Sequence, residues 1–371
     1  MKIIADKNIP FLKGIAESFG DVTYLPGQDF TKENIRDADT LIVRTVTHFG
    51  QENLQDSAVR LICSATIGYD HIDTGYCEQH GIEWHNAPGC NSGSVQQYIA
   101  SALITIARKK SFSLKGKTIG VVGVGNVGKK VTSIAEILGM RVLKNDPPRQ
   151  EAEQSDEFVD IETIKREADI ITFHTPLIRS GKYPTYYLAD KNFFASLGKK
   201  PVIINSARGA IIDTLAIKDA IRDNLISGAI IDCWESEPQI DLEYMRMVDV
   251  ATPHIAGYSA DGKANATRMS LESLARYWQL SDKPIKDIKV PLIENSIIDY
   301  RELKSDNAIE NIILKTYNLL DDHNHLINDP SQFNSLRSNY PLRREYFAYT
   351  VQGVDNKRNE VLLSEIGFIL K

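Results

Sequence analysis

The chain has 371 residues, more than one ordinary hydrophobic core can serve, so we expect two or three domains. Its 43 basic and 49 acidic side chains give a formal charge of -6, which argues against a nucleic-acid or anionic-membrane partner. No stretch reaches the roughly 20 apolar residues that span a bilayer, and the charged start MKIIADKNIP does not resemble a signal peptide. Cys63, Cys77, Cys90 and Cys233 lack CxxC or zinc-site spacing, so we expect reduced thiols, no metal and a cytoplasmic protein.

Short β-rich runs alternate with helical segments along the first hundred residues. The runs are KIIAD, DVTYL, TLIVR and RLICSA. Such alternation is typical of a parallel α/β domain. A long helix is then expected over about 94–109, because the segment ends in basic residues that suit a helix C-terminus.

From residue 117 the alternation starts again, with runs that are almost wholly apolar. They are TIGVVG, MRVLKND, DIITFHT, PVIINSA, SGAIID and VDVATPH. Runs of this kind suit strands that helices bury on both faces, so they predict a complete doubly wound parallel sheet. Because another long helical pattern follows over about 259–278, we expect this second sheet domain to be inserted into the first.

The C-terminal part differs in character. NAIENIILKTYNLLDDHNHL has helical spacing, SLRSNYPLRREYF is aromatic and basic, and EVLLSEIGFILK suits a strand or a short helix. We therefore predict a first domain over 1–99 and 259–285, an inserted domain over 100–258 and a small α+β domain over 290–371. Eighty residues form a marginal core alone, which favours packing on a second subunit in a homodimer.

A glycine turn after the first strand of the inserted domain predicts a dinucleotide site. Gly123, Gly125 and Gly128 form GxGxxG between an expected strand and an expected helix. The glycines allow a tight turn, close approach of a pyrophosphate and close helix packing. Asp146 ends the next expected strand, where a carboxylate binds ribose hydroxyls and repels a 2′-phosphate. We therefore predict NAD, and Arg149 is the feature that would suit NADP.

Polar residues follow four strands of the inserted domain, at the sheet edge where α/β proteins bind ligands. They are Thr175, Arg208, Asp232 and His254. His254 suits an acid/base by its near-neutral pKa, and Glu237 or Asp232 could orient it. Arg208 could bind a substrate carboxylate through two parallel hydrogen bonds. Taken singly, a histidine after a proline in an apolar run is more often a packed core residue, and Arg208 and Glu237 would be surface charges.

Several motifs resemble one enzyme family. HTPL at 174–177, INSARGAIID at 204–213, DCWESEP at 232–238 and TPHIAGYS at 252–259, with the glycine turn, are similar to the D-isomer-specific 2-hydroxyacid dehydrogenases. SATIGYDHID, NAPGCN, DPPR and YPLRREYF resemble a narrower branch, whose members oxidise a phosphorylated four-carbon 2-hydroxy acid in vitamin B6 synthesis. The resemblance implies a Rossmann NAD domain inserted in a flavodoxin-like substrate domain, plus a C-terminal dimerisation domain.

The same resemblance implies the roles of individual residues. The catalytic trio is Arg208, Glu237 and His254, with His254 as acid/base. Further cofactor contacts, beyond the three glycines, fall on Asn126, Val127, Asp146, Thr175, Asp232 and Gly257. Substrate contacts fall on Thr45, Thr66 and Tyr258, and we add Arg44 for the phosphate by its charge and strand-end position.

Some features depart from the family or leave alternatives open. Gln96 and Gln97 stand where relatives usually have Ala-Glu. A sister enzyme such as 3-phosphoglycerate dehydrogenase shares the trunk motifs, but the tail lacks the βαββαβ pattern of a regulatory domain. Glu237 disfavours formate dehydrogenase, which has Gln there. An NAD-sensing corepressor of the same fold is the non-enzymatic alternative, although neither end of the chain is basic or disordered.

Overall fold

The computed structural model describes all residues from Met1 to Lys371. It divides into two compact units, one made of residues 1–91 and 259–292 and the other of 92–258 and 293–371. No helix has both the length and the apolar character that crossing a bilayer requires.

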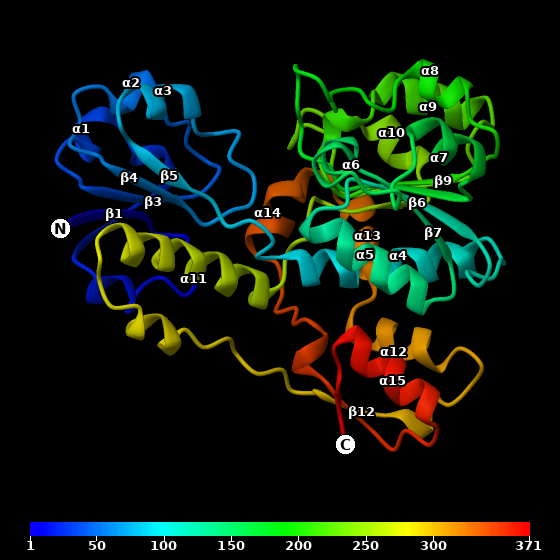
Figure 1. Cartoon of the computed structure of the whole chain (residues 1–371). Helices are drawn as coiled ribbons and strands as arrows, with labels where there is room; N and C mark the ends of the chain where they lie inside the picture. Colours follow the sequence, from blue (N-terminus) through cyan, green and yellow to red (C-terminus); the bar gives the residue numbers. More distant parts are fainter. The chain divides into compact units, whose positions relative to one another are not determined.

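The first unit is a five-stranded parallel sheet in the order β2-β1-β3-β4-β5, the flavodoxin-like order. Its strands are β1 (Lys2–Asp6), β2 (Asp21–Leu25), β3 (Thr40–Val43), β4 (Leu61–Ser64) and β5 (Glu83–His85). Its helices are α1 (Lys32–Ile35), α2 (Gln51–Leu54), α3 (Thr74–Gln79) and α11 (Ala260–Tyr277). Figure 1 shows α1, α2 and α3 on one face of this sheet and α11 along the other.

Alternation along the strands explains these two layers. Ile3 and Ile42 point to the cluster that contains Leu271 of α11. Ile4 and Leu41, their chain neighbours, belong instead to the cluster that contains the helices α1 to α3. Because successive side chains point to opposite faces, a continuous apolar run fills both layers at once.

The second unit holds a six-stranded parallel sheet in the order β11-β10-β9-β8-β6-β7. The strands are β6 (Thr118–Val122), β7 (Arg141–Asn145), β8 (Ile170–Phe173), β9 (Val202–Asn205), β10 (Gly228–Ile231) and β11 (Val250–Ala251). The helices are α4 (Ser92–Lys109), α5 (Asn126–Ile137), α6 (Pro147–Glu153), α7 (Ile161–Glu167), α8 (Lys191–Ala195), α9 (Thr214–Arg222) and α10 (Leu242–Met247). The chain order reverses at β6, so this sheet is the predicted doubly wound fold with a switch point beside β6.

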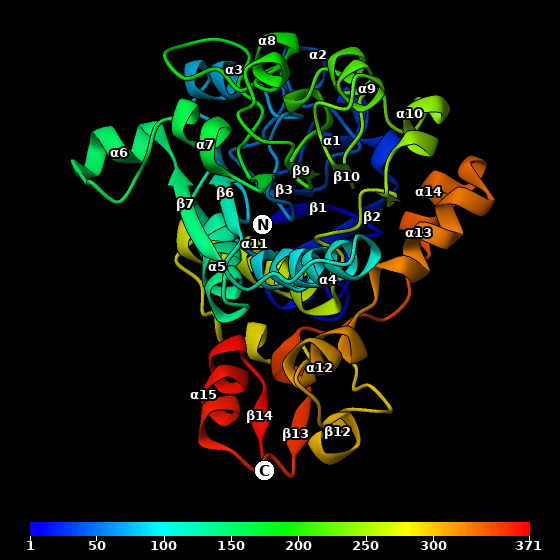
Figure 2. The same cartoon turned by 90° about the vertical axis from the view of Figure 1, so that its right-hand side faces the viewer.

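The C-terminal residues build a small parallel sheet with helices. The strands are β12 (Ile297–Asp299), β13 (Thr350–Gln352) and β14 (Ile369–Leu370), in that order. The helices are α12 (Ala308–Thr316), α13 (Leu319–Asn328), α14 (Phe333–Ser338) and α15 (Lys357–Ile366), and Figure 2 shows α12 and α15 beside the strands. The expected α+β character is therefore confirmed.

The C-terminal segment differs from the expectation in how it packs. We expected a separate domain over 290–371, but 293–371 groups with 92–258 in one unit. The reason is α4, whose first sixteen residues, 92–107, are all buried, so that no face is left for solvent. Gln97, which departs from the family pattern, donates through Nε2 to Thr316 Oγ1 (3.2 Å) and to the carbonyl of Arg344 (3.1 Å). The inserted unit also begins at Ser92 rather than at 100, because α4 belongs to it whole.

Candidate active site

A cavity of about 350 Å³ opens at the carboxyl ends of the strands in the second unit. Its lining comes from the segments that follow β8, β9, β10 and β11: Leu177, Arg179, Tyr186, Arg208, Gly209, Ala210, Trp234, Glu235, Ser236, Glu237 and His254. The predicted trio of Arg208, Glu237 and His254 is therefore brought together on one cavity, although its ends are 46 positions apart in the sequence.

His254 and Glu237 form a direct pair. His254 Nδ1 lies 2.7 Å from Glu237 Oε2, and the backbone N–H of Trp234 donates to Glu237 Oε1 at 2.8 Å. The His254 side chain is 30% exposed and that of Glu237 18%, so the histidine is the more accessible partner. Since Nδ1 is engaged by the carboxylate, Nε2 is the ring nitrogen left for a substrate.

The carboxyl group of Glu237 stays ionised in this setting. Burial by itself would raise the pKa of Glu237, but the hydrogen bond and charge of His254, with the N–H of Trp234, outweigh burial and lower it. An ionised Glu237 can only accept, so Nδ1 of His254 must be the donor. The pair therefore fixes the tautomer that presents Nε2 and stabilises the imidazolium that forms when Nε2 takes a proton.

Asp232 holds the loop that carries His254. Its carboxylate is fully buried and accepts from Thr252 Oγ1 (2.6 Å) and from the backbone N–H groups of Ile255 (2.8 Å) and Ala256 (2.9 Å). These contacts fix the backbone on both sides of His254, whose φ of 56° lies in the left-handed region that costs a residue with a side chain about 1 kcal/mol or more. The structure therefore shows that Asp232 holds this loop, and its predicted contact with the cofactor stays a prediction.

Gly209 joins the turn of Arg208 to the loop of Glu237. A Cβ at Gly209 would lie 2.0 Å from the backbone carbon of Trp234, so only glycine lets the two segments meet. The Arg208 turn is also tied to β9, since Asn205 Nδ2 donates to the carbonyl of Arg208 at 2.9 Å. No periodic pattern singles out Gly209, because its partner Trp234 is 25 residues away in the chain.

The glycine turn after β6 has the features of a dinucleotide site. Gly123 has φ of +87°, and a Cβ at Gly128 would lie 2.0 Å from the carbonyl oxygen of Gly123. A Cβ at Gly125, in contrast, would meet no atom of the protein within 4 Å. Thr175, in the neighbouring loop after β8, has a buried Oγ1 without a hydrogen-bond partner. Open space before the N-terminus of α5 and an unused hydroxyl at the switch point fit a bound dinucleotide.

Of the remaining predicted cofactor residues, Asn126, Val127 and Asp146 adjoin this turn. Asn126 and Val127 open α5, and Gly257 is half-buried in the loop beyond His254. Asp146 accepts from Val124 N (2.8 Å) and, as the N-cap of α6, from Arg149 N. The guanidinium of Arg149 is engaged by both oxygens of Glu153, at 2.7 and 2.8 Å. Because Arg149 is already paired with Glu153, it is a poor partner for the 2′-phosphate of NADP. This is consistent with NAD as the cofactor.

The predicted substrate residues Thr45, Thr66 and Arg44 lie in the first unit, and Tyr258 lies in the second. Thr66 is hydrogen bonded to Ser64 Oγ at 2.6 Å, and Thr45 is exposed. Arg44 forms two hydrogen bonds with the buried carboxylate of Asp6, at 2.9 and 3.2 Å. Arg44 is therefore already paired with a carboxylate, and its contact with the substrate phosphate stays a prediction.

Cys233 lies beside the catalytic pair. The ligand atoms of Cys233, Glu237 and His254 are all within 4.8 Å of one another, which the spacing of the cysteines in the sequence did not indicate. Burial raises the pKa of the Cys233 thiol well above its ordinary value, and the charge of Asp232 adds to this. A metal ion binds the thiolate form of cysteine, and the raised pKa keeps Cys233 protonated. The cluster is therefore a poor metal site, and the absence of a metal stays our prediction.

Comparison with known proteins identifies the family. The model described as the NAD binding domain of D-isomer specific 2-hydroxyacid dehydrogenases matches residues 95–256. A curated erythronate-4-phosphate dehydrogenase of Bacteroides thetaiotaomicron is 52% identical over 358 residues, covering 95% of this chain and 100% of its own. The chain belongs to the erythronate-4-phosphate dehydrogenase family. Another curated member of this family, from Porphyromonas gingivalis, is 42% identical and covers 98% of both chains.

The comparisons also support the fold and the cofactor. An NAD-bound 3-phosphoglycerate dehydrogenase of Entamoeba histolytica superposes with a TM-score of 0.64 at 25% identity, covering 79% of this chain and 99% of its own. A D-lactate dehydrogenase of Aquifex aeolicus has a TM-score of 0.64 at 21% identity, with 77% and 98% covered. A separate model, described as a domain of unknown function, matches residues 290–367. This member of the erythronate-4-phosphate dehydrogenase family is thus an NAD-dependent D-2-hydroxyacid dehydrogenase with an additional C-terminal segment.

Proposed function

We propose that this chain oxidises 4-phospho-D-erythronate with NAD to 2-oxo-3-hydroxy-4-phosphobutanoate and NADH, a step of vitamin B6 synthesis. The observation that carries the proposal is the His254–Glu237 pair, which lines one cavity with Arg208 in the unit that holds the dinucleotide turn. The likeness to erythronate-4-phosphate dehydrogenases over nearly the whole chain supplies the choice of substrate.

The residues on the cavity divide the work of the reaction. Arg208 binds the substrate carboxylate, since a guanidinium can donate two parallel hydrogen bonds to it. His254 takes the proton of the C2 hydroxyl at Nε2, and the ionised Glu237 stabilises the imidazolium. The glycine turn, the N-terminus of α5 and Asp146 would hold NAD, which would supply the acceptor for the hydride of C2. In the reverse direction His254 returns the proton to the same oxygen.

A substrate comparison tests the proposal. Purified protein is incubated with NAD and, in turn, 4-phospho-D-erythronate, 3-phosphoglycerate and D-lactate, with a 2-oxo acid present in parallel samples to reoxidise NADH. We expect 4-phospho-D-erythronate to give the highest kcat/KM. A higher value for 3-phosphoglycerate would assign the chain to the sister activity, and tight NAD binding without turnover of any acid would favour the sensor.

We further propose that the C-terminal segment joins two copies of the chain. Ile297, Thr350 and Ile369 are in register across β12, β13 and β14, so their side chains share one face of the sheet. Ile297 is 60% exposed and Ile369 50%, while Ile298 and Val351 on the other face are buried. An uncovered apolar sheet face suits an interface with a second copy. Sedimentation should give a dimer mass for the wild type and a monomer mass for I297K/I369K; a wild-type monomer would refute this.

We place the protein in the cytoplasm. All four cysteines are buried free thiols, which suits a reducing compartment. Fractionation of the source cells, with the activity measured in each fraction, tests this placement.

A further inference from the structure

Arg337, on α14 of the C-terminal segment, lies beside Tyr258, which follows His254 by four residues in the chain. Its guanidinium carbon lies 5.6 Å from the centre of the Tyr258 ring and 5.8 Å from that of Phe333. Burial, the largest effect, raises the pKa of Glu237, while His254 and the N–H of Trp234 lower it. The positive charge of Arg337 lowers this pKa further, by a smaller amount. Arg337 thus lies against Tyr258, a residue that we expect to contact substrate.

We propose that Arg337 binds the phosphate group of the substrate and so sets the preference for a phosphorylated acid. The proposal rests on the proposed function and names the residue that recognises the part of the substrate remote from the reaction. A phosphate monoester carries nearly two negative charges at neutral pH, and a guanidinium matches its oxygens through two hydrogen bonds.

The hydrogen bonding of Arg337 supports a ligand at this position. The Nε of Arg337 is buried and has no hydrogen-bond partner. A buried donor without an acceptor costs free energy, which an acceptor oxygen from a ligand would offset. The guanidinium is positioned by its contacts with the two aromatic rings.

Two other arginines that could bind a phosphate already have partners within the chain, and a third is a rival to Arg337. Arg343 is buried and donates to the carbonyl of Ala256 and to Ser94, so it ties α4 to the loop after His254. Arg44 is paired with Asp6. Arg179 lines the catalytic cavity but is exposed and stacks on Tyr186, with its guanidinium carbon 4.5 Å from the ring centre. Arg179 is therefore the rival that the experiment has to include.

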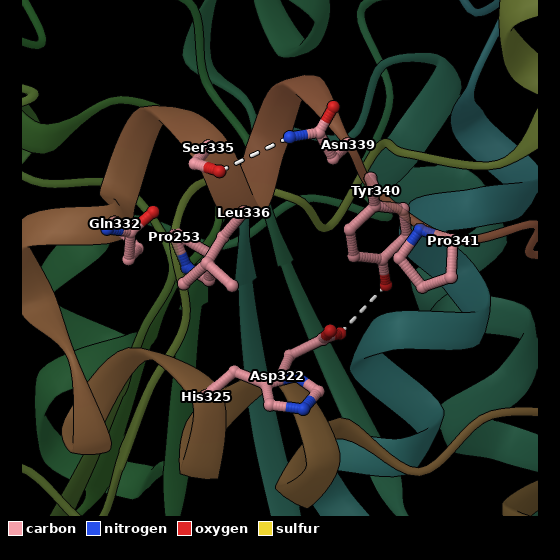
Figure 3. Close-up of a pocket in the computed structure, with 9 residues that line it drawn as sticks. All are labelled: Pro253, Asp322, His325, Gln332, Ser335, Leu336, Asn339, Tyr340 and Pro341. Carbon is pink, nitrogen blue, oxygen red and sulfur yellow. Dashed lines mark hydrogen bonds between the residues drawn. The ribbon is translucent and has the colours of Figure 1, made fainter.

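Contacts of Leu336 and Tyr340, on either side of Arg337 in the chain, hold α14 in place. Figure 3 shows Leu336 directed toward Pro253, the residue before His254, across a cavity of about 260 Å³. Tyr340 donates to Asp322 at 2.8 Å, and its ring meets the Tyr258 ring edge-on with centres 5.8 Å apart. Because Leu336 and Tyr340 anchor both sides of Arg337 in the chain, the guanidinium is held rather than free to swing into solvent.

The family comparison agrees with a role in specificity. Arg337 falls in residues 290–367, which match a model separate from the NAD-binding model at 95–256. The hydride-transfer machinery belongs to the shared part, so a residue in the additional part can alter the choice of substrate without altering the chemistry. The segment of unknown function would then take part in substrate recognition.

Kinetics of Arg337→Met with a phosphorylated and an unphosphorylated acid test the proposal. For 4-phospho-D-erythronate we expect KM to rise roughly 100-fold with kcat little changed, in the range for removing one partner of a desolvated charge pair. For D-erythronate, which lacks the phosphate, KM should not change. Inorganic phosphate should inhibit the wild type competitively and the variant at least 10-fold more weakly. Arg337→Lys should recover part of the affinity, since it keeps the charge.

Two further variants complete the design. Arg358→Met removes an exposed arginine of α15 and should match the wild type in both assays. Arg179→Met should leave the discrimination between the two acids unchanged. Equal losses for both acids in Arg337→Met, or a phosphate-specific loss in Arg179→Met alone, would overturn the proposal. If Arg337→Met does not fold, unchanged phosphate inhibition in Arg337→Lys would overturn it. A wild type that does not oxidise 4-phospho-D-erythronate would instead refute the proposed function.

Discussion

His254→Ala should lower kcat roughly 100-fold or more and leave NAD affinity within about threefold of the wild type, because it removes the acid/base and no cofactor contact. The imidazole is held by a 2.7 Å hydrogen bond from Nδ1 to Glu237, so the variant loses both the proton acceptor and the charge partner of Glu237. Steady-state kinetics gives kcat, and quenching of protein fluorescence by NADH gives cofactor affinity.

Two further variants accompany His254→Ala: Glu237→Gln tests the charge partner of His254, and His80→Ala is a control for loss of a histidine. Glu237→Gln keeps the shape of the side chain but cannot stabilise an imidazolium by charge, so kcat should fall by roughly 10-fold or more with KM less affected. His80 is an exposed histidine of the first unit, and His80→Ala should leave kcat unchanged. A collapse of NAD affinity in His254→Ala, with kcat nearly retained at saturating NAD, would show that His254 is structural.

Asp232→Asn should lower the free energy of unfolding by about 3 kcal/mol, the upper range for a buried donor left without an acceptor. The carboxylate accepts from Thr252 and from the N–H groups of Ile255 and Ala256, and an asparagine would turn an NH2 group toward at least one of these donors. The loop of His254 should then shift, and a shift of about 1 Å can cost roughly 100-fold in kcat. Urea unfolding followed by tryptophan fluorescence measures the stability.

Asp160→Asn is the matched control for this variant. Asp160 is exposed and caps α7 by accepting from Thr163 N at 2.7 Å, a position where asparagine serves as well as aspartate. Its unfolding free energy should stay within about 0.5 kcal/mol of the wild type. Unchanged stability in Asp232→Asn together with a weakened affinity for NAD would show that Asp232 acts on the cofactor rather than on the loop.

Most of the fold could be predicted from the sequence because the strands are buried on both faces. The runs from KIIAD to VDVATPH all form strands, and α11 begins at Ala260, one residue beyond the expected start. β5 was missed, since Glu83–His85 contains no apolar run. The helical pattern after 307 is broken at Tyr317 and Asn318, because Asn318 caps a second helix by accepting from Leu320 N.

The residues of the candidate site that follow strands could be predicted from their order along the chain. Arg208, Glu237 and His254 stand at strand ends, and a parallel sheet brings such ends to one edge. Gly209 and Arg337 could not be recognised, because their roles come from contacts with Trp234 and Tyr258, which are distant in the sequence. The motif predicts a cofactor contact for Asp232, and only the structure shows that its carboxylate also holds the loop of His254.

Transfer of deuterium from C2 of the substrate tests the central claim most directly. The wild type is supplied with NAD and 4-phospho-D-erythronate that carries deuterium at C2, and the NADH is analysed by mass spectrometry. We predict one deuterium in each NADH formed, because the hydride leaves C2 as His254 takes the hydroxyl proton. NADH that contains no deuterium, or no NADH at all, would contradict the account.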